Sequence, residues 1–362
     1  MKKLSMNNFV LPSFEPDTHP IVKGTVLVTG IEGYIGSVMV RYLRGYDVYG
    51  LDAGFYRERK FYFDAEDIPK IYTADVRFFP VDMLKGFDAV IYLSELSNDP
   101  LGQMSPNLTY ENNHIGCIRF AQACKEAGVK KFIYSSSCSV YGTYNDSIKN
   151  EEHDTHPISE YAKCKVLNER KLIELKDKNF CPVILRNATA YGPSPSMRFD
   201  LCVNNMVGDS WVYHRIKVDN EGLAWRPLVH VEDICKAFVT ALEAPPNVIR
   251  GQIYNVGSND QNYQIKDIAK IILKECGACD ILYESYFNDT RSYRIDFNKI
   301  TKDLGFVCSK KIEDGIKDLT RVFRKIDLNE EYLKCRVFRR LNQIQYLLKT
   351  HLVNDQLFWE IL

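Results

Sequence analysis

The sequence predicts an α/β fold built on a doubly wound parallel sheet. From Gly24 onward, short β-branched runs alternate with helical stretches, which is the pattern of repeated βαβ units. Three of the runs are apolar without a break, as expected of strands that are buried on both faces: TVLVT, AVIYL and VILR. A glycine-rich turn directly follows the first of them. These observations indicate one large sheet with helices on both sides.

The predicted elements follow one another along most of the chain. Strands are expected at Thr25–Thr29, Asp47–Leu51, Ile71–Thr73, Asp88–Leu93, Lys131–Ser135 and Val183–Arg186, and helices over 35–44, 107–127 and 158–176. The rhythm ends in the loop Gly192-Pro193-Ser194-Pro195, after which we expect a strand at Ile253–Val256 and helices over 232–243, 264–275 and 312–324. Residues 329–350 predict one amphipathic helix, docked on the body or on a partner, because their apolar side chains recur at helical spacing: Leu333, Val337, Leu341, Ile344 and Leu348.

Composition excludes several classes of partner. Lys plus Arg and Asp plus Glu both number 47, so no overall basic field exists to hold nucleic acid or an anionic membrane. The 11 cysteines are scattered, which suits a reducing compartment. No apolar run approaches the length of a membrane span, and the N-terminus is polar and interrupted by prolines, so a cytoplasmic location is expected. Cys276 and Cys279 form a lone CxxC without a nearby histidine, which favours packing over a metal or redox site, and no metal is expected.

The glycine-rich turn predicts a dinucleotide site. Gly30, Gly33 and Gly36 lie in the pattern GxxGxxG between the first strand and the first helix. Glycines there permit a tight turn and let backbone N–H groups approach a pyrophosphate at the positive end of a helix. With the neighbouring Tyr34 and Ile35, these residues are the first cofactor-binding candidates. The context of strand, turn and helix is that of a Rossmann fold.

Further cofactor candidates end the next strands of the sheet. Asp52 closes the second strand, where a carboxylate accepts the ribose hydroxyls of NAD and repels the 2′-phosphate of NADP, so NAD is favoured. Asp75 and Val76 end the third strand, where an adenine would lie, although Asp75 could equally be a carboxylate that caps a turn. Leu93 and Ser94 follow the fourth strand and complete this set.

A second set of residues carries acid–base chemistry. Tyr161 and Lys165 are four residues apart in a helical stretch, so both side chains emerge on one face. The ammonium group favours the phenolate and tunes the tyrosine towards proton transfer with a hydroxyl group. Ser137 lies 24 residues earlier, at the carboxyl end of a strand, where doubly wound sheets bind their ligands.

Four motifs together resemble a known family. SSSCSVYG at 135–142, the YxxxK pair, the glycine turn and RPLVHVEDI at 226–234 are similar to the extended short-chain dehydrogenase/reductases, the NAD-dependent epimerase/dehydratase family, from about residue 24 to 325. The resemblance implies a catalytic triad of Ser137, Tyr161 and Lys165, with Lys165 also holding the nicotinamide ribose. It further implies that the tyrosine takes a hydroxyl proton while hydride passes to NAD, commonly at sugar C4.

Two more segments are similar to a subgroup that acts on nucleotide-activated hexoses and heptoses: YGPSPSMRFDLCVNN at 191–205 and RSYRIDFNK at 291–299. The resemblance implies a nucleotide-sugar substrate and a homodimer that forms through the helices near 107–127 and 158–176. Arginine suits bidentate phosphate binding, which makes Arg226 the strongest candidate at the diphosphate. The complete set of substrate candidates is Ser97, Asn98, Thr189, Arg198, Asn204, Asn205, Arg226 and Arg291.

Other positions depart from the family's patterns. In 4,6-dehydratases an acidic pair follows the serine or threonine, whereas Cys138 and Ser139 stand there in this chain, which disfavours dehydration. Cys138 directly follows Ser137, so in an extended segment it faces the other way and is expected to be a packed thiol. Glu95 is unusual after the fourth strand, and we expect it to contact substrate or to cap a helix.

The domain division follows from these assignments. We expect an N-terminal arm over 1–22, an NAD-binding Rossmann domain over 23–192 plus 226–259, a smaller α/β substrate domain over 193–225 plus 260–326, and a C-terminal helical extension over 327–362. The leading functional hypothesis is an NAD-dependent nucleotide-sugar epimerase or dehydrogenase working through a keto intermediate. A 4-keto-sugar reductase and a non-catalytic dinucleotide-binding sensor or scaffold are the alternatives.

Overall fold

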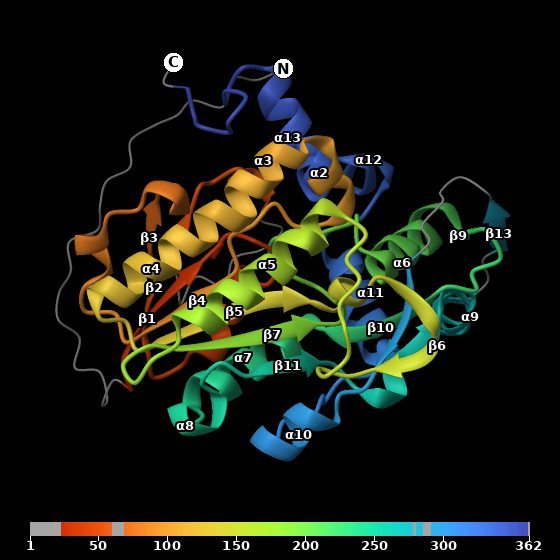
Figure 1. The fold of residues 1–362 in the computed structure, drawn as a ribbon. Coiled ribbons are helices and arrows are strands. Elements are labelled where there is room, and N and C mark those ends of the chain that lie inside the picture. The colour runs from red at the N-terminus through yellow and green to blue at the C-terminus, as the bar shows by residue number, and fades with distance from the viewer. Residues whose placement is uncertain (1–22, 60–68, 278–279, 285–290, 361–362) are drawn as a thin grey trace.

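A computed structural model describes residues 23–59, 69–277, 280–284 and 291–360 and is centred on a parallel sheet (Figure 1). The seven strands lie in the order β11-β7-β5-β4-β1-β2-β3. Every neighbouring pair is parallel, and the order reverses between β1 and β4, so the predicted doubly wound sheet is confirmed. The strands are β1 (Thr25–Thr29), β2 (Asp47–Asp52), β3 (Lys70–Thr73), β4 (Ala89–Tyr92), β5 (Lys131–Ser137), β7 (Cys181–Asn187) and β11 (Ile253–Val256).

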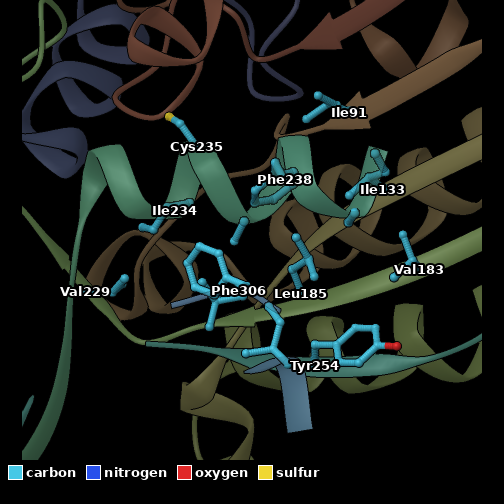
Figure 2. Close-up of a cluster of buried hydrophobic side chains, with 14 of the residues drawn as sticks. Ile91, Ile133, Val183, Leu185, Val229, Ile234, Cys235, Phe238, Tyr254 and Phe306 are labelled. Carbon is cyan, nitrogen blue, oxygen red and sulfur yellow. The ribbon is translucent and has the colours of Figure 1, made fainter. Parts of the chain in front are cut away.

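Alternate side chains of each strand enter two different hydrophobic layers. Val26 and Val28 of β1 pack in the layer that holds α7 (Val231–Glu243), whereas Leu27 packs in the layer that holds α4 (Cys117–Ala127) and α5 (Glu160–Leu175). Figure 2 shows the first layer, with Ile234 and Phe238 of α7 above the sheet residues Val183 and Leu185 and with Ile133 at the level of the helix. Successive side chains of a strand point to opposite faces of the sheet, so both faces are apolar and both are covered by helices. The ends of the strands are left free for a site.

The helix expected over 35–44 is shorter than predicted. It consists of α1 (Gly36–Met39) followed by a 3₁₀ turn over Val40–Tyr42. The helix expected over 107–127 is present but not uniform, because α3 (Pro106–Thr109) passes through a π-helical segment, Tyr110–Gly116, before α4. A further short helix, α2 (Asp99–Met104), precedes α3. Such π-helical segments are often found near functional sites.

A second hydrophobic cluster lies beyond the ends of the sheet strands. Its centre is formed by α6 (Cys202–Tyr213), α9 (Ile265–Cys276), α11 (Ile312–Lys325) and β9 (Arg215–Asp219). These elements come from both segments of the predicted substrate domain, but Leu333 and Phe338 of the extension join them, and the domain division stays a prediction. The remaining elements are β6 (Thr143–Lys149), β8 (Thr189–Tyr191), β10 (Trp225–His230), α8 (Pro246–Ile249), β12 (Asn262–Gln264), β13 (Asp280–Glu284), β14 (Ser292–Ile295) and α10 (Asn298–Leu304).

The prediction of a single helix over 329–350 is wrong. The segment forms α12 (Glu330–Lys334), a 3₁₀ turn over Arg336–Phe338 and α13 (Arg340–Lys349), and the backbone leaves the helical region at Arg339, with φ −131° and ψ 112°. Phe338 packs in the second cluster, whereas Ile344 packs against residues of α2, and one straight helix could not reach both. The extension therefore docks on the body of its own chain, beside α2 and α3 in Figure 1. Within the described residues, no helix has both the length and the apolarity needed to cross a membrane.

Candidate active site

A cavity of about 1690 Å³ opens at the carboxyl ends of the sheet strands. It reaches from the glycine turn after β1 to Lys217 in β9 and Tyr283 in β13. Cavities of roughly 300–1,000 Å³ hold one small ligand, so this volume leaves room for a dinucleotide and a second ligand beside it. The position at the reversal of strand order is where doubly wound sheets bind their ligands.

The glycine turn forms one end of this cavity. Gly30 has a positive φ of 68°, and a Cβ there would lie 2.8 Å from the carbonyl oxygen of Leu93. A Cβ at Gly36 would overlap the carbonyl oxygen of Gly30. A side chain at either position would therefore force the turn apart, and only glycines leave the backbone open to a pyrophosphate. Tyr34 and Ile35 line the same end.

Asp52 ends β2 beside the glycine turn. Its two carboxylate oxygens accept the backbone N–H groups of Glu32, at 3.0 Å, and Gly54, at 2.8 Å. Burial raises the pKa of Asp52, and the neighbouring Glu32 adds to that rise. Arg57, which follows in the loop, forms an ion pair with Glu32 at 3.0 Å, so its charge is already partnered. Two carboxylates beside the ribose position favour NAD over NADP.

Asp75 performs the turn-capping role that the sequence left open. Its side chain accepts the backbone N–H of Arg77 at 2.8 Å and forms an ion pair with the Arg77 guanidinium at 2.6 Å. It still lines the cavity, as do Val76, Leu93 and Ser94. All the predicted cofactor residues therefore lie around one cavity.

The three predicted catalytic residues also line this cavity. Ser137 is the last residue of β5, and its Oγ accepts the backbone N–H of Ser139 at 3.1 Å. Tyr161 and Lys165 lie in the first turns of α5, with the Lys165 Nζ 5.3 Å from the centre of the Tyr161 ring. Burial raises the pKa of Tyr161, whereas the ammonium group of Lys165 lowers it.

A buried ion pair fixes the helix that carries the tyrosine. Arg186 of β7 binds Glu169 of α5 through two hydrogen bonds, at 3.0 Å and 2.7 Å. Ser136, next to Ser137 in β5, donates to the same carboxylate at 2.5 Å. Because β5, β7 and α5 meet at this carboxylate, Tyr161 is held in place relative to Ser137.

Glu95 is a residue whose role the sequence did not reveal. Its Oε2 lies 2.6 Å from the Lys165 Nζ, and both side chains are buried. Its Oε1 accepts the hydroxyl of Tyr134 at 2.6 Å, and Asn168 of α5 donates to that hydroxyl at 2.8 Å. Glu95 thus pairs with the lysine predicted to be catalytic and does not serve as a helix cap, which only the three-dimensional structure reveals.

Three predicted substrate arginines line the same cavity. Arg198 forms a two-point ion pair with Asp200, at 2.9 Å and 3.1 Å, and donates to the hydroxyl of Ser97 at 3.3 Å. Arg291 forms an ion pair with Asp99. Arg226 donates to the carbonyl oxygens of Trp225, at 2.9 Å, and of Arg291. Several cationic groups therefore gather where an anionic ligand could bind.

The polar substrate candidates divide into two groups. Ser97, Asn98, Thr189 and Asn205 line the cavity. Asn204 does not line it, because its amide is buried and holds the loop before α6, accepting from the Gly192 N–H at 2.9 Å and donating to the Arg198 carbonyl at 3.1 Å. The structure therefore gives Asn204 a role in shaping the loop, unlike the contact expected from the sequence.

Cys138, next to Ser137, does not line the cavity. Cys138 is buried and its Sγ lies 3.3 Å from the carbonyl oxygen of Arg186, and burial raises the pKa of its thiol. A packed thiol was expected at this position. Cys279 lies outside the described residues, so the CxxC pair is not seen as a whole. No cluster of His, Cys, Asp or Glu in the described part of the chain could hold a metal ion.

Comparison with known proteins places the chain in a family. Residues 26–257 match the model of the NAD dependent epimerase/dehydratase family. The chain belongs to this family. It is therefore an enzyme whose cofactor is NAD, and the expectation drawn from the four motifs is confirmed. The glycine turn and Asp52 described above fit that cofactor.

Individual relatives extend over most of the chain. It is 26% identical over 331 residues to a UDP-glucose 4-epimerase of Bacillus subtilis, covering 82% of this chain and 96% of that protein. A UDP-glucose 4-epimerase of Mycolicibacterium smegmatis is 28% identical over 315 residues, covering 82% and 98%. The solved structure of MoeE5 in complex with UDP-glucuronic acid and NAD has a TM-score of 0.73 and 24% identity, covering 83% of this chain and 99% of that one. This structural likeness establishes the fold.

Proposed function

We propose that this chain is a nucleotide-sugar epimerase or dehydrogenase that oxidises a sugar hydroxyl, at C4, through a keto intermediate. The observation that carries the proposal is the joint placement of Ser137, Tyr161 and Lys165 in a cavity large enough for NAD and a second ligand. The UDP-glucose 4-epimerases that it resembles over 82% of its length support the substrate class.

The chemistry follows from the charges around Tyr161. The phenolate accepts the proton of the substrate hydroxyl, and the Ser137 hydroxyl binds the same substrate oxygen. Lys165 stabilises the phenolate, because a cation 5.3 Å from the ring centre favours the charged form. NAD, when bound, accepts the hydride from the carbon that carries this oxygen.

The diphosphate of the substrate would bind beside the three arginines that line the cavity, Arg226, Arg198 and Arg291. Guanidinium groups suit bidentate recognition of phosphate. Ser97, Asn98, Thr189 and Asn205 would supply further hydrogen bonds there. An uncharged substrate such as a steroid would leave these arginines unused.

Dehydration is disfavoured by the residues beside Ser137. Elimination of water from the sugar needs an acid and a base in addition to the tyrosine. Cys138 is buried and Ser139 is not ionisable, while Glu95, the nearby carboxylate, is held by Lys165 at 2.6 Å. The site therefore supports oxidation and reduction at one hydroxyl.

Incubation with UDP-sugars, followed by chromatographic separation of the products, tests the proposal. An epimerase regenerates its NAD and accumulates no NADH, a dehydrogenase produces NADH, and a 4-keto-sugar reductase consumes it in proportion to product. The variant Tyr161→Phe should lose at least about a hundredfold in turnover while its NAD content stays unchanged. Full activity of that variant would contradict the role of Tyr161 as the base. No turnover of any nucleotide sugar by the wild type would leave the dinucleotide-binding sensor or scaffold as the better description.

A homodimer in the cytoplasm completes the proposal. The interface would involve α4 and α5, whose inner faces carry the core residues Phe120 and Leu172. Light scattering on the purified protein measures the particle mass, and the mass of one chain would contradict a dimer.

A further inference from the structure

The C-terminal extension reaches the glycine turn of the NAD site through Arg340. This residue is the first of α13 and lines the main cavity. Its Nη2 lies 3.7 Å from the point that a Cβ of Gly33 would occupy, and its guanidinium stacks 3.8 Å from the ring centre of Tyr56. Gly33 is the second glycine of the turn, where the backbone of such folds approaches the pyrophosphate. The guanidinium is therefore placed beside the expected diphosphate.

The charge of Arg340 has no counter-charge in the described part of the chain. The residue is only 4% exposed, and its Nε and Nη1 atoms have no hydrogen-bond partner among the residues that the structure describes. The negative charge of Asp52 favours the charged form of the Arg340 side chain from a distance. Among the described residues, no carboxylate lies close enough to form an ion pair with it. Burying an unpaired guanidinium is costly, so the arrangement is stable only if another group supplies the missing acceptors.

The end of the extension lies at the adenine end of the same site. Leu357, Phe358 and Trp359 line a small hollow together with Ala53, Thr73, Ala74 and Asp75, at the carboxyl ends of β2 and β3. The indole N–H of Trp359 donates to the Ala53 carbonyl at 2.6 Å. Phe358 stacks on the Arg77 guanidinium at 4.2 Å. The sequence placed the adenine beside Asp75, and the extension walls this position.

Direct bonds hold the extension over the site. Gln343 of α13 donates to the Phe55 carbonyl at 2.9 Å, in the loop after β2. The backbone N–H of Arg340 donates to the Asp200 carboxylate at 3.1 Å, which also binds Arg198. The MoeE5 structure is covered over 99% of its length, whereas 83% of this chain is covered, so part of this chain has no counterpart in it.

We propose that the extension completes the NAD site, with Arg340 binding the pyrophosphate and Trp359 closing the adenine slot. Phosphate oxygens would accept from the edge of the guanidinium that holds Nη2, the atom nearest Gly33, together with Nε or Nη1 beside it, since guanidinium groups bind phosphate through parallel N–H bonds. The inference rests on NAD as the cofactor and not on the identity of the sugar.

Calorimetric titration of NAD into cofactor-free protein tests the role of Arg340. The variant Arg340→Met keeps an unbranched apolar stem but removes the charge, and its NAD dissociation constant should rise about tenfold to a hundredfold. Arg336→Met is the matched control: Arg336 belongs to the same extension and pairs with Glu58, Gln343 and Tyr346, but it does not line the cavity. Its dissociation constant should stay within about twofold of the wild type. Arg340→Lys keeps a positive charge and should fall between the two.

Thermal melting separates this role from a structural one. Without NAD, Arg340→Met should melt at the wild-type temperature or above it, because an unpaired buried charge has been removed. The rise in melting temperature on adding NAD should shrink. A structural residue would behave in the opposite way, with a lower melting temperature in the absence of NAD.

Three results would overturn the proposal. An unchanged NAD affinity in Arg340→Met would show that the charge does not reach the cofactor. Tighter binding would show that Arg340 occupies the pyrophosphate position and blocks it. An equal loss in Arg336→Met would assign the effect to docking of the extension. Because no sugar is present in these titrations, failure of the proposed sugar chemistry would leave their outcome untouched.

Discussion

Two buried cations, Lys165 and Arg340, line the main cavity, and their surroundings differ. Lys165, which we place beside the nicotinamide, is paired with Glu95 at 2.6 Å, and that carboxylate accepts a hydrogen bond from Tyr134. Arg340, which we place beside the pyrophosphate, is equally buried, but its Nε and Nη1 atoms have no hydrogen-bond partner among the described residues. A buried charge is costly unless it is paired, so a buried cation without a partner points to a bound anion. In our proposal the protein itself neutralises Lys165, whereas NAD neutralises Arg340.

The different surroundings of Lys165 and Arg340 suggest different roles, one in proton transfer and the other in binding the cofactor. At Tyr161 the neighbouring charges change the pKa of the phenol. Burial raises this pKa, Lys165 lowers it and Glu95 raises it further. Beside Gly33, the role that we propose for Arg340 is to bind NAD. Changes around Lys165 are expected to alter turnover and pH dependence, and changes around Arg340 to alter cofactor affinity.

The largest effect is expected from removing the paired cation. Lys165→Met should lower turnover at least about a hundredfold, since the phenolate loses its stabilising charge. It should also reduce the free energy of unfolding by about 3–5 kcal/mol, because Glu95 is left buried without its partner. Urea denaturation measures this loss. The double variant Lys165→Met/Glu95→Gln should regain most of the stability but none of the activity, and equal instability of both variants would show that the pair does not interact as described.

A smaller effect is expected from removing only the carboxylate. Glu95 raises the pKa of Tyr161, so Glu95→Gln should lower it. Because the phenolate is the base in oxidation, activity rises as pH increases through this pKa, and the acidic limb of kcat/KM should move to lower pH. Glu160→Gln is a suitable control, since Glu160 lies on the same helix but pairs with Lys163 at the surface. A limb that stays in place or moves to higher pH would contradict a role for Glu95 in tuning the tyrosine.

The smallest effect is expected at Asp52, which lies near Arg340 beside the ribose position. Asp52→Asn removes a negative charge that would repel a 2′-phosphate, so the preference for NAD over NADP should narrow by about tenfold. The ratio of the two dissociation constants measures the change. An unchanged ratio would mean that selectivity comes from elsewhere, for example from Glu32, and Glu32→Gln would then be the variant that narrows it.

The local sequence pattern was enough to predict those parts of the site that depend on residues close together in the chain. The glycines at 30, 33 and 36 are required by a turn of a few residues, and Tyr161 and Lys165 share a face because helical spacing puts them there. The strand ends that carry Asp52 and Ser137 were also predicted, because apolar runs end where the sheet ends. Each of these features is set by short-range geometry.

The remaining features depend on contacts between distant parts of the chain. Helical spacing over 329–350 suggested one helix, but its two halves bury their apolar side chains in different clusters, and the backbone bends at Arg339 to reach both. That bend directs Arg340 to a glycine more than three hundred residues earlier. Glu95 and Lys165 likewise meet only because β4 and α5 converge beside the cavity. The sequence by itself thus determined the parallel sheet, the glycine turn and the shared helix face of Tyr161 and Lys165, because these depend on short-range geometry. Tertiary packing decided which buried charges find a partner among the described residues, because those contacts join distant parts of the chain.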